Sequence, residues 1–192
     1  RVVRGQPIAL VGLTGDTTYY YRMRAYNSSE AEYSDYSSTA NGQAAPKTPT
    51  GAACVGIDAT DDLLVTWTDA SSSETSYVVE RSDDGSTGWA DISGALAAGS
   101  TSYQDNVGTA SVTKFYRVKA VRSGISSGYS SVVSAVTAPG TPITCAAVPV
   151  TGGYNVTVTW SDQSSDETSF SIERSNNGST GWAEVGTAAA AA

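Results

Sequence analysis

The sequence predicts an all-β protein built from tandem antiparallel β-sandwiches. Three observations carry this prediction: apolar and polar residues alternate in short runs, turn residues separate the runs, and the whole pattern repeats along the chain. The composition agrees, because it is rich in Ser, Thr, Gly, Val and Tyr, which favour strands and turns over helices. The 192 residues are 40% hydrophobic, which is enough to build a packed core.

The internal repeat is the strongest signal. Residues 69–76 recur as residues 162–169, an offset of 93 positions. Trp67 returns as Trp160 with the same offset. Self-similarity at a fixed period is typical of tandem domains or repeat arrays, so each copy is expected to fold in the same way.

The second half of the repeat recurs near the start of the chain, where residues 21–25 match residues 116–120. Pro-x-x-Pro sequences at 46–49 and 139–142 punctuate the boundaries. We therefore expect a window cut from a longer array, with the true N-terminus missing. Its predicted parts are the C-terminal half of a repeat at 1–45, a complete repeat at 46–139, the N-terminal half of a further repeat at 140–187, and an alanine tail at 188–192 that is either unassigned sequence or a real linker.

Within the complete repeat, apolar residues alternate along three runs at 63–67, 77–79 and 116–120. Turn residues at 69–73, 83–85 and 123–124 separate these runs. The spacing predicts about seven short strands in one sandwich. The expected core residues are Trp67, Tyr77, Val79, Tyr116, Val118 and Ala120, with Trp160, Phe170, Ile172, Tyr21, Met23 and Ala25 facing inward in the flanking halves.

An ion pair is expected on the outer face of this sheet. Glu80 and Arg117 are each adjacent to an inward-facing residue, so their own side chains should point outward. Their two strands pair in such a sandwich. The repeat predicts the same pairing for Glu173 with Arg22 of a neighbouring copy.

These motifs resemble the fibronectin type III family, particularly the versions in bacterial extracellular proteins. The resemblance rests on Pro46 and Pro49, on Trp67, on the Tyr-x-Val pattern at 77–79, and on the pattern that runs from Leu13 through Tyr19 to Ala25. It implies tandem immunoglobulin-like sandwiches in which Tyr19 is a corner tyrosine that hydrogen-bonds near Leu13. The complete repeat departs from this pattern, since Lys114 takes the place of the corner tyrosine.

Charge and composition argue against several functions. The net charge of −8 and the pI near 4.4 repel phosphate backbones and anionic membranes, so we expect no nucleic-acid partner and no membrane insertion. The chain has no histidine and its carboxylates are scattered among turns, so no enzyme, catalytic residue or cofactor is predicted. Cys54 and Cys145 lie in consecutive repeats, and we expect neither a zinc site nor a disulfide between them.

Two acidic patterns have a structural and a functional interpretation. The sequence Asp83-Asp84-Gly85 and its counterpart at 176–178 favour a tight turn over a calcium loop. Asp69 with Glu74, and Asp162 with Glu167, bracket serine-rich loops. We interpret them as loop caps rather than as a weak cation site at the domain junction, and predict no metal site.

The candidate binding residues are two tryptophans and three glycosylation sequons. Trp89 and Trp182 follow Ser-Thr-Gly and either stack on a sugar ring or pack on the stems of Arg81 and Arg174. The possible glycosylation sites are Asn27, Asn155 and Asn177.

The leading functional hypothesis is a structural or spacer array of a secreted or cell-surface protein. Neighbouring copies of the same chain are the expected partners in a head-to-tail extracellular fibre, joined by continuous sequence or by strand complementation. The alternative is an adhesion or carbohydrate-binding accessory module of a secreted hydrolase or adhesin, with glycans as partners.

Overall fold

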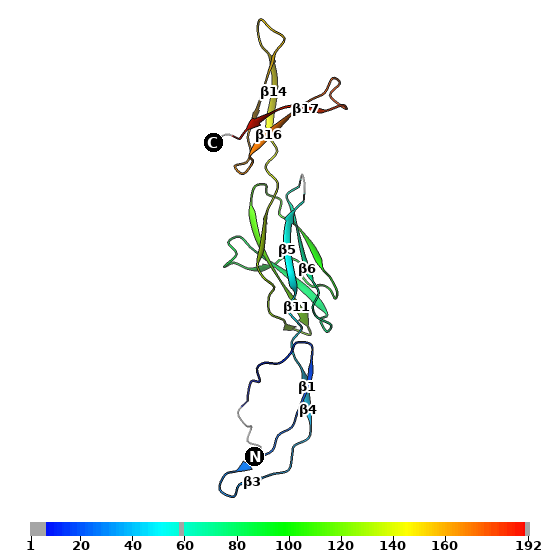
Figure 1. Ribbon diagram of the computed structural model, residues 1–192, viewed down its shortest axis with the longest axis vertical. Helices are drawn as coiled ribbons and strands as arrows, with labels where there is room; N and C mark the ends of the chain where they lie inside the picture. The colour runs from blue at the N-terminus through cyan, green and yellow to red at the C-terminus, as the bar shows by residue number, and fades with distance from the viewer. Residues whose placement is uncertain (1–6, 58–59, 191–192) are drawn as a thin grey trace. The chain divides into compact units, whose positions relative to one another are not determined.

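The computed structural model describes residues 7–57 and 60–190, so the predicted tail residues Ala191 and Ala192 lie outside the described residues (Figure 1). In this part of the chain every regular element is a β-strand, which confirms the all-β prediction. We refer to residues 7–45, 46–139 and 140–190 as the N-terminal, central and C-terminal segments.

The strands are short, as expected from the closely spaced turn residues. The N-terminal segment contains β1 (Thr18–Tyr21), β2 (Tyr26–Asn27), β3 (Glu32–Tyr33) and β4 (Ala40–Gln43). The central segment contains β5 (Thr50–Gly56), β6 (Asp62–Thr68), β7 (Ser76–Ser82), β8 (Ala90–Asp91), β9 (Leu96–Ala97), β10 (Ser102–Asn106), β11 (Thr113–Arg122), β12 (Ile125–Ser126) and β13 (Val133–Val136). The C-terminal segment contains β14 (Ile143–Pro149), β15 (Val156–Ser161), β16 (Ser169–Arg174) and β17 (Ala183–Ala189).

Two antiparallel sheets form in the central segment. One has the strand order β10-β6-β5, and the other has the order β12-β11-β7-β8, with β13 also paired to β11 and β9 to β7. In the second sheet Glu80 lies opposite Arg117, and Val79 lies opposite Val118. This register places alternate residues of both strands on the same face, as the period of two predicts.

The predicted central residues all lie in the core of this sandwich, which also contains Leu63 and Val65. Trp67 is 4% exposed, and its ring centroid lies 5.6 Å from that of Tyr77. The other predicted core residues are fully buried: Tyr77, Val79, Tyr116, Val118 and Ala120. Because each buried side chain removes its apolar surface from water, these residues stabilise the sandwich.

The tight corner before β1 confirms the role that the resemblance implies for Tyr19. Its hydroxyl accepts a hydrogen bond from the backbone N–H of Thr14 at 2.9 Å. At the equivalent corner before β11 a different residue makes the bonds: Thr137 is buried, accepts from the N–H of Val112 at 3.1 Å and donates to the carbonyl of Thr109 at 2.8 Å. A hydroxyl from β13's end thus replaces the missing corner tyrosine.

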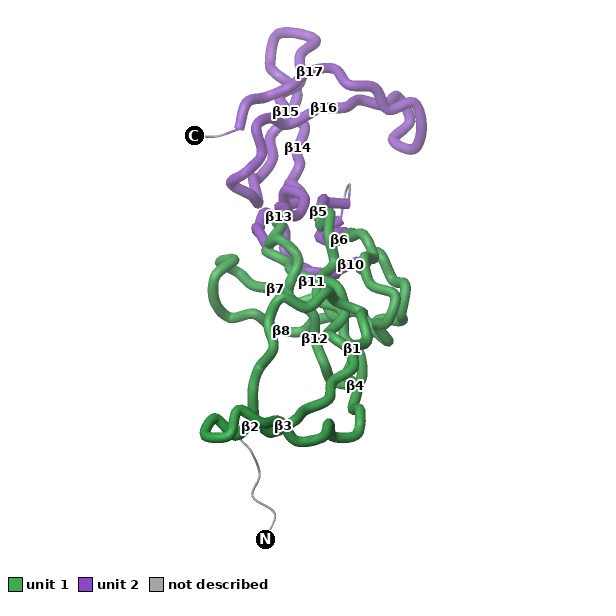
Figure 2. The backbone as a smooth tube through the Cα atoms, turned by 60° about the horizontal axis from the view of Figure 1, so that its bottom comes forward, with its two compact units in different colours: residues 1–54, 65–103, 115–134 green, residues 55–64, 104–114, 135–192 purple. Residues whose placement is uncertain are grey.

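The chain divides into two compact units (Figure 2). Unit 1 comprises Arg1–Cys54, Val65–Tyr103 and Phe115–Ser134, and it contains the buried core from Val65 to Ala120. Unit 2 comprises Val55–Leu64, Gln104–Lys114 and Ala135–Ala192. Unit 2 contains two separate two-stranded sheets, β14-β15 and β16-β17.

The predicted inward residues of the two flanking segments are less buried than their central counterparts. Met23 is 75% exposed, whereas its equivalent Val118 is fully buried. Trp160 and Phe170 are half-buried and contact each other with ring centroids 5.2 Å apart. The predicted alanine tail begins as strand, because Ala188 and Ala189 extend β17 and pair with β16.

Candidate interaction sites

The outer face of the β7-β11 sheet carries a compact polar cluster around Glu80. The Arg117 guanidinium donates twice to Oε2 of Glu80, at 2.6 and 2.9 Å. Lys119 Nζ and the Tyr129 hydroxyl donate to Oε1, at 2.7 and 2.8 Å. The predicted Glu80–Arg117 pair is therefore confirmed. Glu80 is more enclosed than a usual surface residue, with 10% of its side chain exposed.

This cluster shifts the pKa of the carboxyl at its centre. Burial raises the pKa of Glu80, but hydrogen bonds from Lys119, Arg117 and Tyr129 outweigh burial and hold the pKa below its usual value. The same bond to Glu80 raises the pKa of Lys119. Both shifts favour the charged forms, so Glu80 is a carboxylate and Lys119 an ammonium group at neutral pH.

Two aromatic rings enclose the arginine of this cluster. The Arg117 guanidinium lies 4.3 Å from the ring centroid of Trp89 and 3.7 Å from that of Tyr129. Such cation–π contacts are favourable where the cation is partly desolvated. One face of Trp89 is therefore occupied by the protein. The cation that stacks on Trp89 is Arg117 of β11, whereas the sequence predicted packing on the stem of Arg81 of β7.

The N-terminal segment holds one half of an equivalent cluster. Arg22 corresponds to Arg117, and its guanidinium lies 3.8 Å from the ring centroid of Tyr36, which corresponds to Tyr129. Arg24 stacks in the same way on Tyr33, at 3.7 Å. The N-terminal segment therefore supplies the arginines of the cluster and the tyrosine rings on which they stack.

The C-terminal segment holds the other half. Glu173 and Trp182 correspond to Glu80 and Trp89, and with Ser171 they line a shallow hollow of about 520 Å³. Trp182 is 53% exposed. The segment's apolar face forms a further hollow of about 840 Å³, whose walls include Trp160, Phe170, Ile172 and Val185.

A second polar site connects the N-terminal segment to the serine-rich loop at 71–73. Asp16 Oδ1 accepts hydrogen bonds from the hydroxyls of Ser71 and Ser73, at 2.8 and 2.6 Å. Its Oδ2 accepts from the N–H of Ser72 at 3.1 Å. These bonds outweigh the effect of burial and lower the pKa of Asp16.

Arg122 completes this site from the end of β11. Its guanidinium donates to the Ser73 hydroxyl at 2.6 Å and to the carbonyls of Gln43 and Ala44, at 3.3 and 2.9 Å. Sequence reasoning missed both Asp16 and Arg122. The sequence signal that could have indicated this site was a Gly-Asp corner in one repeat and a serine-rich loop in the next.

The aspartates of the two acidic loops are caps, as predicted. Asp69 accepts from the N–H of Ser71 at 3.0 Å and from the Tyr77 hydroxyl. Asp162 accepts from the N–H of Ser164 at 3.1 Å. Across residues 7–57 and 60–190, no group of three or more His, Cys, Asp or Glu side chains is placed to hold a metal ion.

The Asp-Asp-Gly sequence forms the predicted turn. Asp84 accepts from the N–H groups of Ser86 and Thr87, at 2.8 and 2.7 Å, and Gly85 has a φ of 72°. At the equivalent turn Asn177 accepts from the N–H groups of residues 179 and 180, and Gly178 has a φ of 73°. Glycine is the residue best suited to this backbone conformation.

The three sequons are exposed, and their glycosylation remains a prediction. Asn27 lies in β2 and accepts from the N–H of Ser29 at 3.0 Å. Asn155 immediately precedes β15, and Asn177 lies in the turn before β17.

Cys145 is a free thiol, so it forms no disulfide with Cys54.

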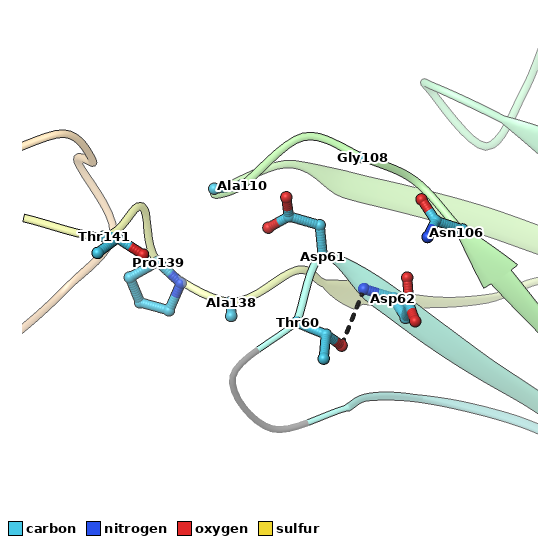
Figure 3. A pocket seen from close by; sticks show the side chains of 9 residues that line it. All are labelled: Thr60, Asp61, Asp62, Asn106, Gly108, Ala110, Ala138, Pro139 and Thr141. Atoms are coloured by element: carbon cyan, nitrogen blue, oxygen red, sulfur yellow. Dashed lines mark hydrogen bonds between the residues drawn. The ribbon is translucent and has the colours of Figure 1, made fainter.

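One further hollow, of about 500 Å³, lies at the loop between β5 and β6. Figure 3 shows Asp61 pointing toward Ala110, and Asp62 on the side of Asn106. The N–H of Asp62 donates to the Thr60 hydroxyl at 3.2 Å, and Asp62 accepts from the side chain of Gln104 at 2.7 Å. The Asp62 carboxylate is thus engaged in a bond to the neighbouring strand β10.

No protein-family model and no curated protein matches the sequence. Among solved structures, an Fn3-like protein from Clostridium thermocellum is 26% identical over 48% of this chain and 93% of its own, with a TM-score of 0.43. The FN1–FN3 domains of chicken CNTN1 are 14% identical over 91% of this chain and 64% of theirs, also at 0.43. A β-1,2-glucanase from Parabacteroides distasonis is 24% identical over 50% of this chain and 13% of its own, at 0.41.

The strand order carries the identification. A three-stranded sheet, β10-β6-β5, faces a sheet with β11 and β7 at its centre, around a buried tryptophan on β6. This is the arrangement of an immunoglobulin-like sandwich. Together with the corner bond of Tyr19, this strand order is that of a fibronectin type III-like fold.

Proposed function

We propose that this chain is a non-catalytic structural repeat array of a secreted or cell-surface protein, and that its copies associate head to tail into an extracellular fibre. The acidic, Ser- and Thr-rich composition and the absence of histidine support a structural role outside the cell. No helix in the described part of the chain is long and apolar enough to cross a membrane.

The observation that carries the proposal is the division of one polar cluster into two halves. In the central segment Glu80, Trp89, Arg117 and Tyr129 form a complete cluster. The equivalent cations and tyrosine stand in the N-terminal segment, and the equivalent carboxylate and tryptophan stand in the C-terminal segment. Docking these segments from two copies would reproduce the central cluster, with opposite charges facing each other.

The apolar faces are complementary in the same register. In the central sandwich Val118 lies opposite Val79 and Ala120 lies opposite Tyr77. The equivalent pairs between copies are Met23 with Ile172, and Ala25 with Phe170. Association would bury Met23 and the apolar residues that line the hollow beside Trp160. Removing this apolar surface from water favours association. A head-to-tail contact of this kind propagates as a filament.

Charge reversal tests this assembly. We expect the wild-type chain to grow in sedimentation velocity as its concentration rises. Glu173→Arg and Arg22→Glu should each keep the chain monomeric, because like charges then face each other, and the double variant should assemble again. Glu30→Arg is the matched control, since it makes the same charge change at an exposed turn. Assembly unaffected by either single reversal, or a wild-type monomer at every concentration, would contradict the proposal.

A second candidate function is carbohydrate binding through Trp182, whose exposure of 53% leaves a ring face open. Its counterpart Trp89 is already stacked on Arg117, so only the C-terminal segment presents such a face among these two tryptophans. Glycan-array binding by the monomeric Glu173→Arg variant, lost on adding Trp182→Ala, would favour this function over the structural one.

A further inference from the structure

Two successive repeat junctions in this chain share the same backbone hydrogen bond and the same local backbone conformation. At the first junction the N–H of Asp16 donates to the carbonyl of Ala45 at 3.0 Å. At the second junction the N–H of Ser111 donates to the carbonyl of Ala138, also at 3.0 Å. Asp16 and Ser111 have positive φ angles of 63° and 56°. Ser111 therefore occupies the structural position of Asp16.

The loops that follow each junction also correspond. Ser71 donates its N–H to Asp69 at 3.0 Å, and Ser164 donates its N–H to Asp162 at 3.1 Å. With these caps aligned, Asp166 stands at the position that Ser73 occupies in the first loop. The residue types at these two positions are therefore exchanged. At the first junction the corner holds an aspartate and the loop a serine, whereas at the second junction the corner holds a serine and the loop an aspartate.

Each member of the second pair has a polar group available. The Ser111 hydroxyl oxygen is buried and has no hydrogen-bond partner among the described residues. Such orphaned groups are rare because a buried polar atom without a partner costs about 1–3 kcal/mol. Asp166 is exposed on its loop, and its carboxylate is an acceptor that a hydroxyl donor can satisfy.

The linker between these two loops contacts both of them. The Ser111 N–H bonds to Ala138, and a Cβ placed on Gly140 would lie 2.6 Å from the carbonyl oxygen of Gln163. Glycine at 140 thus permits the loop at 162–167 to approach the linker closely. Figure 3 shows Thr141 of the linker and Ala110 of the corner, which border the same hollow.

We infer that the second junction closes by the same hydrogen bond as the first with its polarity reversed: the Ser111 hydroxyl donates to the Asp166 carboxylate. One acid and one hydroxyl are needed at each junction, because two carboxylates would repel each other and two hydroxyls would lose the stronger charged bond. The inference concerns junctions along one chain, so it stands independently of any association between copies.

A direct test measures amide exchange in residues 164–167 of the full chain, with and without the substitution Ser111→Ala. This variant removes the hydroxyl donor, so amide exchange in the loop should become faster. Exchange that is unaffected by Ser111→Ala would overturn the inference.

A swap cycle tests the reversed polarity. Ser111→Asp and Asp166→Ser should each speed amide exchange in residues 164–167 by about tenfold, as the loss of a charged hydrogen bond predicts. The double variant recreates the residue pair of the first junction and should restore slow exchange. Ser131→Asp adds the same charge at an exposed position elsewhere and should change nothing there. A double variant no better protected than the single variants would also overturn the inference.

Discussion

At the scale of single residues, Glu80 shows how one carboxylate organises a sheet surface. It accepts hydrogen bonds from Arg117, Lys119 and Tyr129, and so holds two cations beside each other on β11. Without its charge these cations would repel each other. Glu80 is also largely withdrawn from water, so its interactions are screened less than those of an exposed ion pair.

We expect Glu80→Gln to lower the free energy of unfolding at pH 7 by about 2 kcal/mol, because two partly buried cations lose their counter-charge. Since the folded state lowers the pKa of Glu80, its contribution is present above the unfolded value of about 4.3 and is lost as the pH falls through the folded pKa. The difference between wild type and variant should therefore vanish in acid.

Urea denaturation across a pH series measures this prediction. Glu30→Gln removes an equal charge from an exposed turn and should leave stability nearly unchanged. A Glu80→Gln loss that stays constant from neutral to acidic pH would show that packing, rather than charge, explains the effect.

At the scale of elements, two corners with the same backbone use different side chains. Tyr19 makes its corner bond from within β1, whereas Thr137 reaches its corner from the end of β13. The Thr137 hydroxyl satisfies one N–H and one carbonyl of the corner loop at once. The first corner is closed by a residue five positions away, whereas the second is closed by a residue 25 positions away. The sequence of one strand does not reveal the second kind of contact.

Thr137→Val should lower the free energy of unfolding by about 1–3 kcal/mol. Valine keeps the shape of threonine but leaves the N–H of Val112 and the carbonyl of Thr109 without their shared partner. Thr101→Val, an exposed position in the central segment, is the matched control. Thermal unfolding of both variants would test the prediction, and equal midpoints would contradict it.

At the scale of the whole molecule, repeated sequence is folded in different surroundings. Trp67 and Trp160 are equivalent, yet only Trp67 lies in a closed core; Val118 is buried, and its equivalent Met23 is exposed. Stability is therefore expected to be uneven, with the sandwich around Tyr77 and Tyr116 exchanging amide protons most slowly. The open segments are where association between copies would add stability.

Much of this architecture follows from local chemistry. The alternation of apolar residues along β6 and β7 places their inward faces, because successive side chains of a strand point to opposite sides. The Glu80–Arg117 pair follows from that phase and from the pairing of two strands. Asp84 and Gly85 specify their turn within a few residues, since its hydrogen bonds are short-range.

Contacts between residues far apart in the chain could not be read in this way. The bonds of Asp16 to the loop at 71–73, and of Thr137 to the corner at 109–112, depend on how separate strands and loops meet in space. The stacking of Arg117 between Trp89 and Tyr129 likewise joins three separate strands or loops. Periodicity determines which face a residue occupies, whereas three-dimensional packing determines which distant side chain it meets there.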